Sequence, residues 1–341
     1  METVIIFGGT GFIGTHLAQH LLREKLAERI VLADTSSPRD ASYAATLQEG
    51  LRAGSVEFVS IDVRKPIPSD ALPSHADLIV NLAAVHREPG HRPEEYFETN
   101  LYGAENVCAY AASIQCPRMV FTSSISPYGP SEELKDETSL PTPETPYGSS
   151  KLAAEKIHLA WQTANQDRKL LILRPGVVFG PGEGGNVTRL IRSVVCGYFV
   201  YIGNRATRKA GGYVKELCSV LLFGLEHQDS AGETATILNF SMSPIPRLED
   251  FVNAIRTVAG IRRSPFSVPR SAVLGASYPI AGIARTFGIR QPISPVRVRK
   301  LFRSTSIDPR RLREIGYTWQ FTLEEAFKDW RNDVPEDFSR G

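Results

Sequence analysis

The first 22 residues, METVIIFGGTGFIGTHLAQHLL, constrain the fold more than any other part of the sequence. Residues 4–7 form an apolar run typical of a buried strand, three glycines follow at GxxGxxG spacing, and apolar residues then recur every four positions, as on a helix face. This order predicts a dinucleotide site, because glycines let the backbone approach a pyrophosphate at the helix N-terminus. The alternative is a tight turn without a ligand. The predicted cofactor contacts are Gly8, Gly11, Phe12, Ile13 and Gly14.

The next predicted strand, 29–33, ends at an acid. Asp34 lies twenty residues after Gly14. A carboxylate at this position can accept hydrogen bonds from both ribose hydroxyls and would repel a 2′-phosphate, so the sequence predicts NAD rather than NADP as the cofactor. Arg39 lies close by and weakens this preference slightly.

Two further predicted strands also lead to cofactor candidates. Asp62 and Val63 follow the run 56–61, where the carboxylate could bind the adenine amino group and Val63 could contact the ring. A solvated loop aspartate is the alternative. Small residues after the run 78–82 suit a backbone that lies against the cofactor, and the candidates there are Leu82, Ala83 and Ala84.

The segment around Tyr147 supplies the chemistry. Tyr147 and Lys151 lie four residues apart in an apolar-periodic segment, so both side chains leave the same helix face. A serine-rich turn with Ser124 follows the predicted strand 119–122. The phenol, ammonium and hydroxyl could meet at one point and take a proton from a substrate hydroxyl. Since a free phenol has a pKa of ~10, a base near neutral pH needs that pKa lowered by ~3 units, which a lysine and a positively charged nicotinamide could achieve.

Strands alternate with helices of 10–20 residues through the first half of the chain, which predicts βαβ units and a parallel sheet. We therefore expect an α/β fold with a doubly wound (Rossmann) sheet and a smaller C-terminal α/β substrate domain. The NAD-binding domain is expected at 1–174, with later returns around 213–242. The substrate domain is expected at 175–212 and 243–341, and the apolar stretch 272–289 is expected to be a core or interface helix.

Bulk composition narrows the class of protein. The net charge of +2 gives no indication of a nucleic-acid partner, and no apolar run reaches membrane-spanning length. The four cysteines show no CxxC spacing, so buried free thiols in a reducing compartment are expected. With no signal peptide visible at the start, the prediction is a cytoplasmic protein.

Several motifs resemble the extended short-chain dehydrogenase/reductase superfamily, in particular its NAD-dependent nucleotide-sugar epimerase/dehydratase branch (UDP-glucose 4-epimerase-like). They are GGTGFIG (8–14), Asp34, Asp62-Val63, NLAA (81–84), SSISPYG (123–129), YGSSK (147–151) and RPGVVFGPG (174–182). The resemblance implies that Tyr147 is the catalytic base, that Lys151 binds the nicotinamide ribose, and that Ser124 is the catalytic hydroxyl. It also implies a homodimer paired through the helix at 92–113 and the Tyr147 helix.

Three departures from that branch affect the substrate side. Ile125 and Ser126 stand where 4,6-dehydratases carry Asp-Glu, and Val177 replaces an asparagine that contacts the substrate diphosphate. The usual YVDD turn reads YVKE at 213–216. Basic residues near a glycine-containing loop suit a phosphate, with a solvated surface as the alternative. The substrate candidates are Ser124, Asn186, Arg208 and Lys209.

The leading hypothesis is an NAD-dependent epimerase of a nucleotide-activated sugar. Tyr147 would assist hydride transfer to NAD, a keto sugar would form, and hydride would return to its other face. The first alternative is a net NAD-dependent dehydrogenase or reductase that acts on a keto-sugar or hydroxysteroid-like alcohol. The second is a non-catalytic dinucleotide-binding protein, which the presence of Ser124, Tyr147 and Lys151 disfavours.

Overall fold

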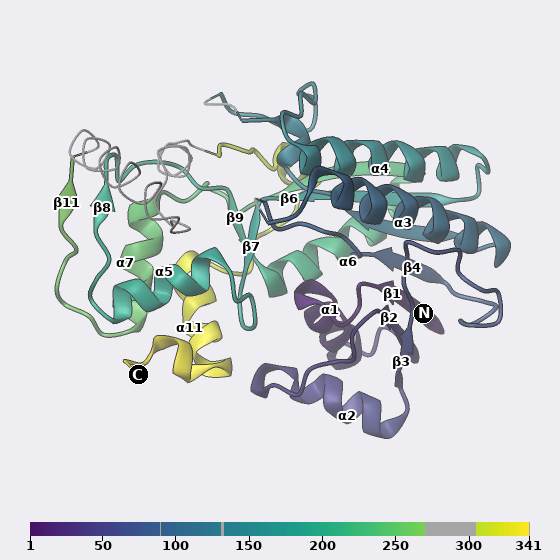
Figure 1. Cartoon of the computed structure of the whole chain (residues 1–341), viewed down its shortest axis with the longest axis horizontal. Helices are drawn as coiled ribbons and strands as arrows, with labels where there is room; N and C mark the ends of the chain where they lie inside the picture. Colours follow the sequence, from purple (N-terminus) through teal and green to yellow (C-terminus); the bar gives the residue numbers. More distant parts are fainter. Residues whose placement is uncertain (89, 131–132, 270–304, 341) are drawn as a thin grey trace, which may run out of the picture.

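The computed structural model describes residues 1–88, 90–130, 133–269 and 305–340 (Figure 1). A seven-stranded, fully parallel sheet forms its centre, in the order β10-β6-β5-β4-β1-β2-β3. The strands are β1 (Thr3–Phe7), β2 (Arg29–Asp34), β3 (Val56–Ser60), β4 (Leu78–Asn81), β5 (Arg118–Thr122), β6 (Lys169–Pro175) and β10 (Ala235–Phe240).

Helices cover both faces of the sheet. One face carries α1 (Phe12–Arg23), α2 (Ala45–Ala53) and α6 (Val214–Ala231), and the other carries α3 (Pro93–Ser113) and α4 (Pro146–Thr163) (Figure 1). Alternate residues of β1 enter different cores: Val4 and Ile6 pack on the α1 side, whereas Ile5 and Phe7 pack on the α3 side. This burial on both faces explains the continuous apolar runs in the sequence and confirms the doubly wound sheet.

The strand order reverses next to β1, which lies between β2 and β4. The connections that leave the carboxyl ends of β1 and β4 run to opposite faces, and open α/β sheets bind ligands at such a point. The glycine turn follows β1, and the short η2 helix (Ser126–Tyr128) follows β5 at the same edge. The topology therefore brings the predicted cofactor and catalytic segments to one edge of the sheet.

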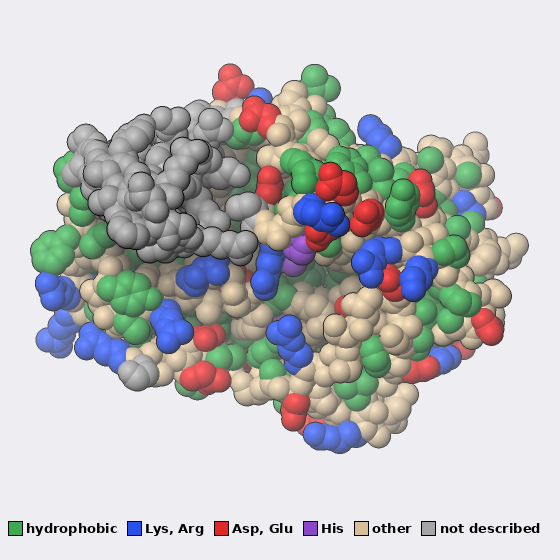
Figure 2. Space-filling view, viewed as in Figure 1, with side chains coloured by type: hydrophobic (Ala, Val, Ile, Leu, Met, Phe, Trp, Pro, Cys, Tyr) green, Lys and Arg blue, Asp and Glu red, His purple; other side chains and the backbone are tan. Residues whose placement is uncertain are grey.

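The remaining elements pack around an aromatic cluster that includes Phe179, Phe327 and Trp330. They are α5 (Asn186–Val195), α7 (Leu248–Val258), α11 (Leu323–Asp333) and η3 (Pro335–Phe338). Two small parallel pairs join them, β7 (Val177–Phe179) with β9 (Gly211–Tyr213) and β8 (Tyr201–Ile202) with β11 (Ser267–Val268). Lys and Arg side chains gather on this part of the molecule (Figure 2).

Two further helix ends are defined by the structure. Pro309 takes the N-cap position of α10 (Arg310–Glu314), and the preceding Asp308 carboxylate binds the Arg313 side chain. Helix α6 ends at Ala231, with Gly232 as its C-cap. The short η1 helix (Ser42–Ala44) precedes α2. The predicted helix at 272–289 lies outside the described residues.

The expected domain boundaries stay a prediction. β10 and α6 do return to the main sheet from the second half of the chain. Within the described ranges, no helix is both long and apolar enough to span a membrane.

Candidate active site

The glycine turn after β1 lies directly against the loop after β4. Gly8 has a φ of +73°, and a Cβ added there would lie 2.7 Å from the amide nitrogen of Ala83. A Cβ at Gly14 would lie 2.5 Å from the carbonyl oxygen of Gly9. Both positions therefore need glycine, and Leu82, Ala83 and Ala84 line the opposite side of the turn, half-buried.

The N-terminus of α1 suits an anion. Gly11 is the N-cap of α1, no side chain caps this end of the helix, and the first turn contains no acid. The backbone N–H groups of Phe12 and Ile13 can therefore donate hydrogen bonds to a ligand. Asp34 lies beside the turn, where its carboxylate accepts hydrogen bonds from Thr10 N at 3.2 Å and Thr35 N at 2.7 Å. Free donors, a glycine cradle and a fixed carboxylate fit the pyrophosphate and ribose of a dinucleotide.

Asp62 and Val63, the predicted adenine contacts, both have partners within the protein. Arg64 binds the Asp62 carboxylate at 2.7 Å, and this hydrogen bond holds the pKa of the acid below its usual value. The Val63 side chain is buried, and a Cβ added to Gly103 would lie 3.0 Å from its methyl group. Val63 therefore packs against α3, so it is its backbone rather than its side chain that could meet an adenine ring.

Tyr147 and Ser124 are brought together at the carboxyl edge of the sheet. Helix α4 begins at Pro146 with Thr145 as its N-cap, whose hydroxyl accepts a hydrogen bond from Gly148 N at 3.1 Å. This start places Tyr147 in the first turn, near the Ser124 hydroxyl, which acts to lower the pKa of the phenol. The Ser124 oxygen also accepts from Ser126 N at 3.1 Å, which fixes the turn after β5.

In the protein without NAD, the pKa of Tyr147 is raised above its ordinary value. Burial raises the pKa of the phenol to about 12, and the hydrogen bond with Ser124 offsets this only partly. The Lys151 ammonium donates instead to the carbonyl of Thr122 at 2.7 Å and lies 4.6 Å from the centre of the Phe121 ring. Burial lowers the Lys151 pKa to about 7, with the charge of Glu155 opposing this.

A chain of buried hydrogen bonds supports the backbone of Tyr147, and the sequence analysis did not predict it. Asn100, on α3, donates to the Ser150 hydroxyl at 2.8 Å, and Ser150 donates to the carbonyl of Tyr147 at 2.8 Å. The Asn100 oxygen accepts from Val85 N at 3.0 Å. The available signal was an asparagine within a helix, a position that amides rarely favour without a partner.

A second missed feature is a buried ion pair beneath the serine turn. Arg174 donates two hydrogen bonds to Glu155, at 2.8 and 2.6 Å, and both side chains are almost fully buried. Ser123 donates to the same carboxylate at 2.5 Å, and Arg174 donates to the Tyr128 hydroxyl at 2.8 Å. The pair therefore ties α4 to the ends of β5 and β6.

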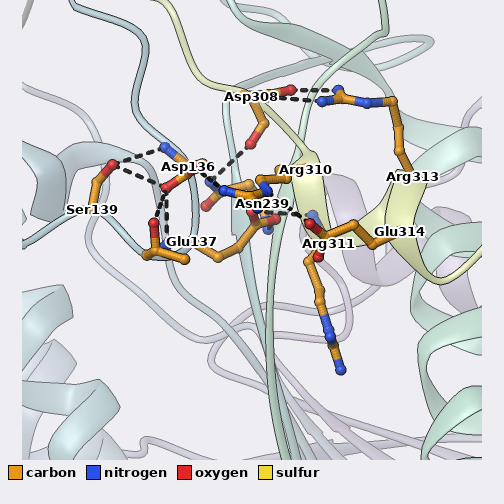
Figure 3. A network of polar contacts seen from close by, with 10 residues as sticks. Asp136, Glu137, Ser139, Asn239, Asp308, Arg310, Arg311, Arg313 and Glu314 are labelled. Carbon is orange, nitrogen blue, oxygen red and sulfur yellow. Dashed lines mark hydrogen bonds and ion pairs between the residues drawn. The ribbon is translucent and has the colours of Figure 1, made fainter.

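The network continues outward to the C-terminal segment (Figure 3). Glu137, in the loop after η2, accepts hydrogen bonds from Asn239 N at 2.8 Å and Arg311 N at 3.2 Å. The side chain of Asn239 accepts from the Tyr128 hydroxyl and donates to the carbonyl of Asp308. Three segments distant in sequence thus meet at one rim of the site.

The substrate candidates lie apart from this centre. Asn186 is exposed at the start of α5 and accepts a hydrogen bond from Arg189 at 2.7 Å. Arg208 is also exposed, and Lys209 lies next to it in a bridge to Thr305. Within the described residues, no contact joins Asn186 or Arg208 to the catalytic candidates.

The divergent YVKE turn anchors the end of the chain. The Tyr213 hydroxyl binds Asp329, and Lys215 binds the same carboxylate at 2.6 Å. Glu216 is buried and accepts hydrogen bonds from the Tyr317 hydroxyl and from two backbone amides, of which Phe321 N is at 2.9 Å. The Lys and Glu of this turn therefore have structural partners.

Comparisons with known proteins agree with this geometry. Residues 4–239 match the NAD dependent epimerase/dehydratase family. The chain is 25% identical to the N-acetyl-alpha-D-glucosaminyl-diphospho-ditrans,octacis-undecaprenol 4-epimerase of Escherichia coli O157:H7, over 95% of this chain and 93% of that protein. It is also 25% identical to 3beta-hydroxysteroid-dehydrogenase/decarboxylase isoform 1 of Arabidopsis thaliana, over 95% of this chain and 77% of that protein.

A solved structure supports the fold. UDP-glucuronic acid 4-epimerase from Bacillus cereus, in complex with NAD, has a TM-score of 0.75 at 18% identity, covering 99% of this chain and 100% of that one. The match to this family confirms the predicted family and its dependence on NAD. The chain belongs to the NAD dependent epimerase/dehydratase family.

Proposed function

We propose that this protein is a 4-epimerase of a sugar activated through a diphosphate, with Ser124, Tyr147 and Lys151 as its catalytic residues. The observation that carries the proposal is the contact between Ser124 and Tyr147, one helical turn before Lys151, at the sheet edge that also holds the glycine turn. The 4-epimerase named for Escherichia coli supports the position of the reaction on the sugar.

Tyr147 accepts the proton of the sugar hydroxyl, and Ser124 holds the reacting oxygen by a hydrogen bond. When bound, NAD supplies reversible hydride acceptance, so that loss of proton and hydride leaves a ketone at one carbon. Rotation of the ketone exposes its other face, and Tyr147 returns the proton once hydride has returned. With Ile125 and Ser126 after Ser124, the turn offers no carboxylate for the elimination of water.

The electrostatics give Lys151 a second role. The ligand-free phenol, with a pKa of about 12, is almost fully protonated at neutral pH. A positive charge near the phenol lowers its pKa, and a ribose hydroxyl can take the place of Thr122 as a partner of the Lys151 ammonium. We infer that the base becomes active only after NAD binds, because both positive charges are then in place.

The residues proposed to bind NAD and the substrate are those that the sequence motifs predict. For NAD they are Gly8, Gly11, Phe12, Ile13, Gly14, Asp34, Asp62, Val63, Leu82, Ala83, Ala84, Tyr147 and Lys151. Asn186, Arg208 and Lys209 would meet the substrate diphosphate in place of the asparagine that Val177 replaces. The NAD domain would comprise 1–174 and 213–242, and the substrate domain 175–212 and 243–341.

The buried cysteines and the exposed apolar residues of α3 support a cellular location and an oligomeric state for this protein. Cys108, Cys116 and Cys218 are buried free thiols, which supports a reducing, cytoplasmic location. Phe97 and Tyr102 are exposed on α3, which supports a homodimer paired through α3 and α4.

The test is to release the nucleotide from the purified protein by denaturation and then to assay UDP-sugars for epimerisation at carbon 4. The proposal expects bound NAD and interconversion of two sugar epimers without net NADH formation. A UDP-sugar and a polyprenyl-diphosphate sugar are compared, because the relative from Escherichia coli is named for the latter. Accumulation of NADH with neither sugar epimerised would contradict the proposal and favour a dehydrogenase.

A further inference from the structure

The end of the molecule formed by β8 and β11 exposes large apolar side chains. Tyr198 and Phe266 are 63% and 64% exposed, and Val200 is 39% exposed. The turns that precede the two strands lie side by side, since Tyr201 N donates to the carbonyl of Phe266 at 2.8 Å. Single exposed apolar side chains are common on protein surfaces, but a group of them marks an interaction site.

Arginines surround these apolar side chains. The Arg263 guanidinium lies 5.1 Å from the centre of the Phe266 ring, and Arg262 is exposed beside it. The Arg205 guanidinium lies 4.6 Å from the centre of the Tyr201 ring. Across the described ranges of the chain, none of Arg205, Arg262 and Arg263 forms an ion pair with a carboxylate.

The sequence segregates charge strongly around this surface. Residues 184–215 contain six Lys or Arg and no Asp or Glu, and the described residues 251–269 contain three Arg and no acid. Figure 2 shows Lys and Arg side chains next to hydrophobic ones at this end of the molecule. Because the whole chain carries only +2, the excess of basic residues is local to these segments of the sequence.

We propose that this surface, the turns 196–200 and 261–266 with Arg205, Arg262 and Arg263, docks onto an anionic lipid bilayer. Aromatic rings and a valine enter the boundary between headgroups and acyl chains, where arginines can bind lipid phosphates. A nucleic acid would also attract the arginines, but it offers little to an aliphatic side chain such as Val200. The docking does not rest on the proposed reaction.

The test is sedimentation of the full-length protein with vesicles of phosphatidylcholine that contain about 30% phosphatidylglycerol, against pure phosphatidylcholine vesicles. The protein is expected to bind the anionic vesicles and to dissociate as salt is raised. The pair R262Q/R263Q should weaken binding by about tenfold or more. Its fold should persist, because Arg256 holds this turn through the backbone carbonyls of residues 262 and 263, which the substitutions keep. Phe266→Ser should weaken binding in the same way.

The matched control is K25Q/R52Q, two exposed basic residues near α1 and α2, at a distance from β8 and β11 (Figure 1). It removes the same charge and should leave vesicle binding unchanged. Equal loss in both pairs, or no binding to anionic vesicles, would overturn the proposal. Binding of an oligonucleotide that R262Q/R263Q abolishes, without vesicle binding, would overturn it in favour of a nucleic-acid partner.

Discussion

The side-chain amide of Asn100 donates a hydrogen bond to the Ser150 hydroxyl at 2.8 Å, and the same side chain joins both backbone groups of Val85. Since Ser150 in turn donates to the carbonyl of Tyr147, one residue of α3 links the loop after β4 to the first turn of α4. The proposed base is therefore positioned by a residue that does not touch the substrate.

Replacing Asn100 by Ala should lower the free energy of unfolding by about 1–3 kcal/mol, because the backbone N–H and C=O of Val85 lose their partner and the Ser150 hydroxyl loses its donor. It should also lower kcat, since the first turn of α4 loses its support. Urea unfolding and steady-state kinetics measure both effects. Ser113→Ala is the control, because Ser113 also lies on α3 and donates to the carbonyl of Tyr110 at 2.8 Å. An equal loss of kcat in both variants would show that Asn100 has no specific role in positioning.

Tyr147→Phe should lower turnover by about 10²–10⁴-fold, because it removes the group that transfers the proton. The ring and its contact with Tyr96, at 6.0 Å between centres, remain, so NAD should stay bound. Turnover and released nucleotide are measured on the same preparation. Tyr96→Phe, which removes only a hydrogen bond to Arg87, should keep most of the activity. Unchanged turnover in Tyr147→Phe would refute its assignment as the base.

The low pKa of Lys151 predicts how stability depends on pH. Its folded-state pKa of about 7 lies below the ordinary value of 10.5, so the unfolded chain binds more protons between these two values. The free energy of unfolding of the ligand-free protein should therefore rise as pH increases from 7 towards 10. Lys151→Met should remove this part of the rise in Tm. An identical pH profile in the variant would contradict the depressed pKa.

Arg174→Met should cost about 3–5 kcal/mol of stability, because it leaves the Glu155 carboxylate buried without its cation. The double change R174M/E155L should recover much of this loss. The exposed pair of Arg29 with Glu57, at 2.7 Å, is the matched surface case, and Arg29→Met should cost less than about 1 kcal/mol. Equal costs at the two sites would show that burial does not set the strength of the Arg174 pair.

Gly14→Ala should weaken NAD binding by about tenfold or more, because the new methyl group displaces the backbone of Gly9, which shapes the turn. Gly50→Ala is the control, since its Cβ would lie 2.7 Å from a methyl of Val56, far from the glycine turn in the sequence. It should lower stability without changing the affinity for NAD, as measured by calorimetric titration.

The sequence predicted those parts of the site that depend on local spacing. The glycine turn, Asp34 and the Tyr147–Lys151 pair each belong to one strand–turn–helix unit, so periodicity and turn residues were sufficient to locate them. Helix α3 likewise starts at Pro93, where the sequence has its proline.

Features that depend on distant partners could not be predicted in this way. Glu155 and Arg174 are nineteen positions apart and pair only because α4 packs against β6. The pKa of Tyr147 depends on how deeply the fold buries the phenol, and the side-chain direction of Val63 depends on α3. The strands β8 and β11 are each two residues long and are defined by their pairing with each other. Neither is long enough to show an alternation of apolar and polar residues in the sequence.

The anchoring of Glu216 has a consequence for biosynthesis. Its donors come from residues 317–321, about one hundred positions later, so the ribosome makes the carboxylate well before any of them. Until then the nascent chain has a polar group at a position that the finished protein buries, and the first turn of α6 lacks these hydrogen-bond donors. A nonsense mutation shortly before Tyr317 would therefore leave Glu216 without these donors and lower the stability of the truncated chain.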